Sequence, residues 1–248
     1  MVGYKIHSKL CLIVRQEEDG LRRYVHLGTG NYNPTTAKLY TDLGLMTCRP
    51  EYGEDAAAVF NLLTGFCQFE GTTKLMVAPF EFQSHTLKLI KRETDYARAG
   101  KPARIVAKMN SLVDKPVIEA LYEASQAGVK IDLVVRGICC LRPGVQEFSP
   151  TITVRSIVDR FLEHSRIYYF ANDDTPEIYV GSGDWMYRNF KKRIEVAFPI
   201  EEPALQSRIL DEILPTQLGD NVKAHQLRPD GTTSSSHPSA PTRLCAVN

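Results

Sequence analysis

Residues 104–135 read RIVAKMNSLVDKPVIEALYEASQAGVKIDLVV and predict a strand, a helix and a second strand. The first six residues are apolar enough for a strand, and Ser111 or Asp114 can cap the helix that follows as far as Gln126. Gly128 ends that helix, and the last five residues form the second, buried strand. This order of elements is typical of an α/β domain.

The same alternation extends in both directions from this stretch, and it predicts one α/β domain with a mixed sheet. Upstream, we expect a strand at Leu75–Ala78 and a helix at Phe82–Ala99. Downstream, we expect strands at Arg166–Ala171, Glu177–Gly181 and Arg193–Pro199, and then a helix at Glu202–Leu214.

The residues before this domain follow another pattern. Strands at Lys5–Arg15 and Tyr24–Gly28 flank turn residues and predict a hairpin. A short helix is expected near Thr35–Lys38, after Pro34, and a longer one at Glu54–Phe69.

We place a domain boundary near residue 73, so that the first domain spans 1–73 and the second spans 74–227. The remaining residues, 228–248, are rich in Gly, Ser, Thr and Pro. Such a segment has little apolar surface to bury, and we expect it to be a disordered tail.

The bulk composition excludes some classes of protein. The 248 residues carry a net charge of +1, which gives no reason to expect a nucleic-acid partner. No apolar run approaches the roughly 20 residues of a membrane span, and no leader is evident at the N-terminus. We therefore expect a cytoplasmic protein, with its six scattered cysteines as free thiols.

Two stretches of the sequence resemble each other. His7-Ser8-Lys9 is followed about twenty residues later by Gly28-Thr29-Gly30-Asn31, and His164-Ser165-Arg166 is followed by Gly181-Ser182-Gly183-Asp184. Each stretch is interpreted as a strand with a histidine and a cation two residues apart, and then a return strand that ends in a turn of small residues. Positions i and i+2 of a strand point to the same face, so each histidine is expected to lie beside its cation.

This pattern suits phosphoryl transfer. An imidazole can act as nucleophile or as general acid and base, and a neighbouring cation can stabilise phosphate oxygens. A single His-x-Lys on a strand is a weak signal, because such a histidine is more often an ordinary strand residue. His26, on the return strand, is the alternative nucleophile, and His7 is preferred because it has the cation at i+2.

The paired layout resembles the phospholipase D superfamily. Longer strings resemble the polyphosphate kinase family, from about Lys5 to Ala224: IHSKLCLI, HLGTGNYNPTTAKLYTD, LVVRGIC, SIVDRFLEHSR and DWMYRN. The resemblance implies two phospholipase D-like α/β domains with mixed sheets. The family's N-terminal domain, helical middle domain and first half of its first catalytic domain have no counterpart here. The first domain is therefore expected to be incomplete and the chain a truncated form.

The resemblance also implies roles for individual residues. The family's phosphorylated histidine corresponds to His7, and its second histidine to His164. Its adenine-stacking tyrosine corresponds to Tyr40, and its phosphate-binding arginine to Arg136. As further phosphate contacts we infer three residues beside the two motifs, namely Lys9, Asn31 and Arg166.

The function implied is reversible transfer of phosphate from ATP to polyphosphate through a phosphohistidine. Mg²⁺ is expected to accompany the nucleotide, with ATP or ADP and polyphosphate as partners. Homo-oligomers and peripheral association with the inner face of the membrane are further properties of the family. Two alternatives stay open: a phospholipase D-type phosphodiesterase, and a non-catalytic remnant that binds polyphosphate.

Overall fold

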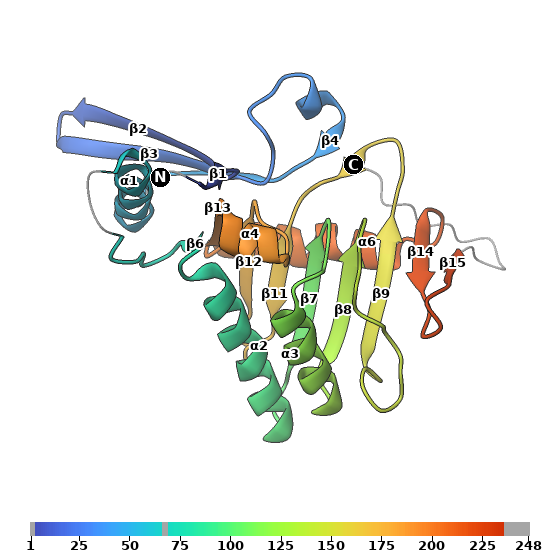
Figure 1. Ribbon diagram of the computed structural model, residues 1–248. Coiled ribbons are helices and arrows are strands. Elements are labelled where there is room, and N and C mark those ends of the chain that lie inside the picture. Colours follow the sequence, from blue (N-terminus) through green and yellow to red (C-terminus); the bar gives the residue numbers. More distant parts are fainter. Residues whose placement is uncertain (1–2, 66–68, 236–248) are drawn as a thin grey trace.

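The computed structural model describes residues 3–65 and 69–235 of the chain, which we call its first and second parts (Figure 1). The first part consists mainly of a long hairpin, formed by β2 (Lys9–Glu17) and β3 (Gly20–Gly28), with α1 (Pro50–Thr64) packed against it. The second part is a large mixed sheet with helices on both faces, and the hairpin lies above one end of this sheet (Figure 1).

The large sheet has strands from both parts. They are β1 (Lys5–Ile6), β6 (Met76–Ala78), β7 (Arg104–Met109), β8 (Lys130–Val135), β9 (Ile152–Ile157), β11 (Ile167–Phe170), β12 (Glu177–Gly181), β13 (Arg193–Pro199), β14 (Ala224–Leu227) and β15 (Thr233–Ser235). Their order is β1-β13-β12-β11-β7-β8-β9-β14-β15, with β6 also paired to β13. Strands β7, β8 and β9 are parallel, whereas β11, β12 and β13 alternate in direction.

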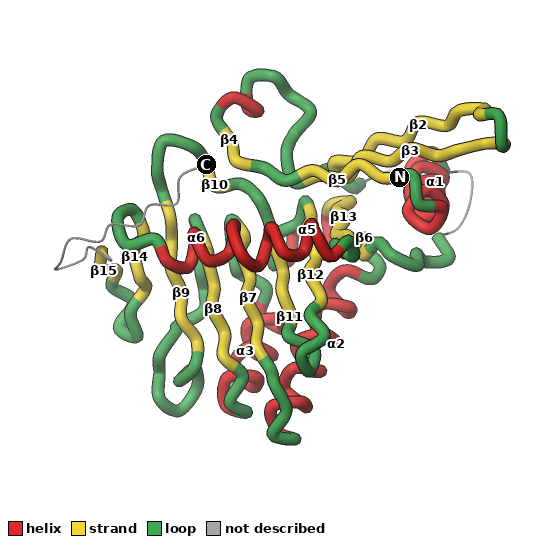
Figure 2. The backbone as a smooth tube through the Cα atoms, turned by 180° about the vertical axis from the view of Figure 1, so that it is seen from behind, coloured by secondary structure: helices red, strands yellow, loops and turns green. Residues whose placement is uncertain are grey.

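Helices cover the two faces of this sheet differently. One face is covered by α2 (Phe82–Arg98) and α3 (Lys115–Gln126) (Figure 1). Asp114 caps the N-terminus of α3, because its side chain accepts a hydrogen bond from the backbone amide of Val117. The other face is crossed by α5 (Pro203–Ser207), a π-helical turn (Arg208–Ile213) and α6 (Leu214–Gly219) (Figure 2). A hydrophobic core lies on each side of the sheet. The predicted α/β fold with a mixed sheet is therefore confirmed.

The two parts are joined by two short parallel strand pairs. Strand β1 of the first part pairs with β13, with Lys5 opposite Arg193. Strand β10 (Leu162–Glu163) of the second part pairs with β4 (Tyr40–Thr41) of the first. Each part therefore contributes a short strand to the other, and both candidate histidines follow directly after these strands.

The predicted strand Lys5–Arg15 is wrong in one respect, because it is two strands. The break falls at His7 and Ser8. Before it, β1 pairs with β13, and after it, β2 pairs with β3. The strand predicted at Arg166–Ala171 likewise begins only at Ile167. Both histidines therefore lie at crossovers between sheets, and not within strands.

Three predicted helices also differ from the structure. The helix predicted at Glu54–Phe69 begins at Pro50, a residue suited to the first helical turn, and Gly65 ends it with a φ of 79°. Residues 66–68 of that prediction lie outside the described residues. The helix predicted at Glu202–Leu214 continues to Gly219 through the π-helical turn. The short helix near Thr35–Lys38 is a 3₁₀ turn at Thr36–Lys38.

Several strands were not predicted. They include β5 (Gly44–Thr47), which pairs with β3, and β9 and β14, which pair with each other and each with one further strand, β8 and β15 respectively. Part of the predicted disordered tail is ordered, because Thr233–Ser235 pairs with β14. The tail residues 236–248 lie outside the described residues.

Candidate active site

The two crossovers have the same backbone geometry. At the first, the amides of His7 and Ser8 both donate to the carbonyl of Ile194. At the second, the amides of His164 and Ser165 both donate to the carbonyl of Thr41. In each case the accepting carbonyl belongs to the other part of the chain, so each histidine is positioned by the part that does not contain it.

A buried carboxylate orients the His7 ring. Glu195 is 0% exposed, and its carboxylate lies 2.9 Å from His7 Nδ1. The same carboxylate accepts from Ser182 Oγ and Asn189 Nδ2, each at 2.5 Å, so its position is fixed by several contacts. With the Nδ1 proton directed at Glu195, Nε2 carries the lone pair, as a nucleophile requires.

The His164 ring is held differently. Its Nδ1 lies 2.7 Å from the Asp42 carboxylate, and its Nε2 lies 3.0 Å from a terminal nitrogen of Arg166. Because a guanidinium can only donate, the Nε2 lone pair accepts this hydrogen bond. Burial lowers the pKa of His164 and Arg166 lowers it further, although the bond to Asp42 opposes them. His164 is therefore a neutral hydrogen-bond acceptor, and its Nε2 is not free to attack phosphorus in this state.

Two buried cations, Lys9 and Arg166, lie at the site. Lys9 is 5% exposed, and its Nζ is 3.2 Å from both ring nitrogens of His7, which places the ammonium against the ring. Burial lowers the pKa of Lys9 to about 8; the nearby Glu195 opposes this shift and the nearby Arg166 adds to it. Because the charge of Arg166 acts on Lys9, the cations of the two motifs lie near one another. This is where a polyanion would gain most from the charges.

We expect the affinity of the ligand-free chain for tripolyphosphate to fall as pH rises through about 8, because Lys9 is charged below that pH and neutral above it. The Kd, measured by titration calorimetry, should rise about tenfold or more, since a charged hydrogen bond contributes ~1.5–3 kcal/mol and ~1.4 kcal/mol is tenfold. The Lys9→Gln variant should bind weakly at every pH. A wild-type Kd that does not change through this range would exclude Lys9 from the binding site.

Arg136 joins the site through Asn110. Its Nε donates to Asn110 Oδ1 at 2.9 Å, and Asn110 Nδ2 donates to the carbonyl of His164 at 3.0 Å. The Asp184 carboxylate accepts from the backbone amide of Asn110 at 2.8 Å and from Arg166 Nε at 3.1 Å. Burial alone would raise the pKa of Asp184, but Arg166 and Asn110 outweigh burial and hold it below its usual value.

A pocket of about 310 Å³ in the first part adjoins His164, because Tyr40 and Asp42 line the pocket and both contact that histidine. Tyr40 lies in its wall, with its ring centroid 4.9 Å from that of His164. Asn31 and His26 line the same pocket, and His26 Nδ1 is 2.7 Å from the Tyr32 hydroxyl. Among the described residues, His26 forms no ion pair, which distinguishes it from the two motif histidines.

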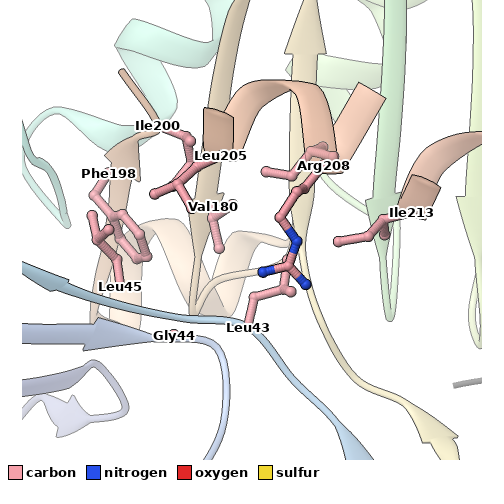
Figure 3. A pocket seen from close by; sticks show the side chains of 10 residues that line it. Leu43, Gly44, Leu45, Val180, Phe198, Ile200, Leu205, Arg208 and Ile213 are labelled. Atoms are coloured by element: carbon pink, nitrogen blue, oxygen red, sulfur yellow. The ribbon is translucent and has the colours of Figure 1, made fainter. Parts of the chain in front are cut away.

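A second pocket, between the first part and the π-helical turn, has a different character (Figure 3). Arg208 is the one charged side chain among the described residues that line it, and the others are apolar or glycine. Such a lining does not suit a polyphosphate, so we assign the chemistry to the histidine site.

The structure brings six of the predicted site residues into one connected group. They are His7, Lys9, Tyr40, Arg136, His164 and Arg166. Asn31 and His26 lie on the pocket beside this group.

Four polar residues hold the group in place: Asp42, Asn110, Asp184 and Glu195. Sequence reasoning named Asp184 only as part of the second turn and missed the other three. Two signals could have found members of this set: Glu195 interrupts an apolar strand, and Asn110 directly follows one.

The expected Mg²⁺ has no prepared site among the described residues. Over 3–65 and 69–235, no group of three or more His, Cys, Asp or Glu side chains could hold a metal ion. The carboxylates at the site already accept hydrogen bonds from the histidines and from Arg166. These residues do not fit a resident Mg²⁺.

The described helices also include none that could span a bilayer.

Comparison with known proteins identifies the family. The chain matches the model "Polyphosphate kinase C-terminal domain 1" over residues 1–69 and "Polyphosphate kinase C-terminal domain 2" over residues 75–245. The chain belongs to the polyphosphate kinase family. A polyphosphate kinase of Synechocystis is 55% identical over 241 residues, which is 97% of this chain and 33% of that relative. The Thermosynechococcus vestitus polyphosphate kinase is 57% identical over 230 residues, or 93% of this chain and 31% of the relative.

A solved structure agrees with this assignment. The crystal structure of polyphosphate kinase from Porphyromonas gingivalis is 40% identical and superposes with a TM-score of 0.93. The match covers 99% of this chain and 38% of that structure. The chain therefore spans about a third of the length of the polyphosphate kinases that it matches.

Proposed function

We propose that this chain carries the phosphotransfer site of an ATP:polyphosphate phosphotransferase, with His7 as the residue that is phosphorylated. The observation that carries the proposal is the asymmetry between the two histidines. Nδ1 of each is held by a carboxylate, but only the Nε2 of His164 is occupied by a hydrogen bond from an arginine. The Nε2 of His7 has the Lys9 ammonium 3.2 Å away, but this ammonium is equally close to Nδ1, so it lies against the ring and is not directed at the Nε2 lone pair that would attack.

In the first step, His7 Nε2 attacks the γ-phosphorus of ATP in line with the leaving oxygen. The N–P bond forms as the P–O bond breaks, and ADP leaves with that electron pair. Glu195 stabilises the positive charge that develops on the imidazole, while Lys9 and Arg166 stabilise the phosphoryl oxygens. In the second step, a terminal oxygen of polyphosphate attacks the phosphorus, and the N–P bond breaks to restore His7.

The remaining residues bind and orient the substrates in this proposal. The neutral His164 accepts from Arg166 and so fixes the direction of its guanidinium. Tyr40 offers a half-buried ring beside the pocket, which suits stacking on a base. Arg136 and Asn31 are assigned to the nucleotide phosphates. Mg²⁺ would arrive bound to ATP, and none of these steps depends on a metal site in the chain.

The experiment is to incubate the purified chain with Mg²⁺ and γ-labelled ATP and to measure label that is labile in acid and stable in base. We expect labelled wild-type protein, and the label should then pass to added polyphosphate. The His164→Ala variant should still be labelled, at a rate lower by on the order of 10²-fold, because the orientation of Arg166 is lost.

Other results would favour the alternatives. A folded wild-type chain that binds polyphosphate and acquires no label would indicate a non-catalytic remnant. Release of label to water from a phosphodiester, with no transfer to polyphosphate, would indicate a phosphodiesterase instead.

A further inference from the structure

Asn110 lies directly after β7 and contacts three groups of the site. Its Oδ1 accepts from Arg136 Nε at 2.9 Å, and its Nδ2 donates to the carbonyl of His164 at 3.0 Å. Its backbone amide donates to Asp184, which in turn binds Arg166. One residue, through its side chain and its backbone amide, therefore connects the two arginines with His164.

The partners determine which way the amide faces. A guanidinium can only donate and a carbonyl oxygen can only accept, so the oxygen of the Asn110 amide faces Arg136 and its nitrogen faces His164. Asn110 is 5% exposed, so water competes little for these bonds. A residue without both a donor and an acceptor cannot replace these contacts.

The two partners come from different strands. Arg136 follows β8, and His164 lies at the crossover between β10 and β11. Backbone pairing of β7 with both β8 and β11 brings these segments together, but it does not fix a long side chain. Arg136 is only partly buried, so its guanidinium depends on side-chain contacts for its direction.

We infer that Asn110 is a positioning residue that sets the Arg136 guanidinium relative to His164. The inference rests on the proposed function, because it assumes that Arg136 binds phosphate. Asn110 acts through Arg136 and His164 and makes no contact with substrate itself. Without it, Arg136 loses its direction, and displacement of a charged group by about 1 Å can cost on the order of 10²-fold in rate.

The Asn110→Ala variant should fold. Arg166 also donates to the carbonyl of His164, and the backbone amide of Asn110 still reaches Asp184. Each partner other than Arg136 therefore keeps a hydrogen bond. Asn110→Ser is a second, more conservative variant. Asn61→Ala, on the exposed surface of α1, is the matched control.

The test is a double-mutant cycle between Asn110→Ala and Arg136→Ala, with the Kd for tripolyphosphate as the readout. We expect Asn110→Ala alone to raise this Kd by about tenfold, which is the effect of losing one well-placed charged contact. In the Arg136→Ala background the same change should raise it by less than about twofold, because the group that Asn110 directs is gone. Asn61→Ala should change nothing, and the melting temperature of each variant reports on folding.

Equal losses in both backgrounds would mean that Asn110 acts only on the fold, and the inference would be wrong. The labelling assay separates this result from the fate of the proposed function. If the wild type binds tripolyphosphate with the expected coupling but is never labelled, the proposed function is wrong while the role of Asn110 stands. If the wild type neither binds tripolyphosphate nor acquires label, both are wrong.

Discussion

Replacing His7 with alanine should abolish the acid-labile label altogether, which is the largest effect on activity that we expect from one substitution. The reason is chemical, since the variant has no nitrogen to form the N–P bond. Glu195 keeps its hydrogen bonds from Ser182 and Asn189, so the surrounding structure should persist. The measurement is the stoichiometry of label per chain after incubation with γ-labelled ATP.

His26→Ala is the matched control. His26 lies on the neighbouring pocket, where it contacts Tyr32, and among the described residues it forms no ion pair. We expect this variant to retain the label. If His7→Ala is labelled and His26→Ala is not, the nucleophile is His26, and the geometric argument from Glu195 and Lys9 is wrong.

Replacing Arg166 with methionine should lower the free energy of unfolding by about 3–5 kcal/mol, because removal of one partner leaves a buried charge without its counter-ion. Arg166 is 3% exposed and Asp184 is 5% exposed, and their ion pair at 3.1 Å lies beside the core. The measurement is urea denaturation of the wild type and the variant under identical conditions.

Two further variants make this result specific. Combining Arg166→Met with Asp184→Asn removes both charges and keeps an acceptor for the Asn110 amide, so much of the lost stability should return. Arg208→Met removes an exposed arginine and should change the unfolding free energy by less than about 1 kcal/mol. If Arg166→Met lowers the free energy of unfolding no more than Arg208→Met does, the buried ion pair does not stabilise the fold.

Local patterns of the sequence were enough for much of the fold. Apolar runs and capping residues located the strands and helices of residues 104–135, because those elements are determined by nearby residues. Strand β14 could not be predicted in this way, since Ala224–Leu227 has an ordinary polar sequence and forms through pairing with β9. The break between β1 and β2 at His7 could not be predicted from local sequence either, because it depends on hydrogen bonds to the distant carbonyl of Ile194.

The candidate site shows the same division. The spacing of His7 and Lys9, and of His164 and Arg166, was visible in the sequence, and each pair is in contact in the structure. The carboxylates were not visible, since Glu195 is 188 residues from His7 and Asp42 is 122 residues from His164. No local pattern reports a partner at that distance along the chain.

Each of the two motif histidines is oriented by a carboxylate from the other part of the chain, and this arrangement limits which substitutions the two parts tolerate. Each part contains one of the two motif histidines and the carboxylate that orients the motif histidine of the other part. A change of Asp42 in the first part or of Glu195 in the second therefore disturbs the histidine ring of the other part. If the two parts were produced as separate polypeptides, neither would hold an oriented histidine until they reassociated, and recovery of the phosphoenzyme would then measure their affinity directly.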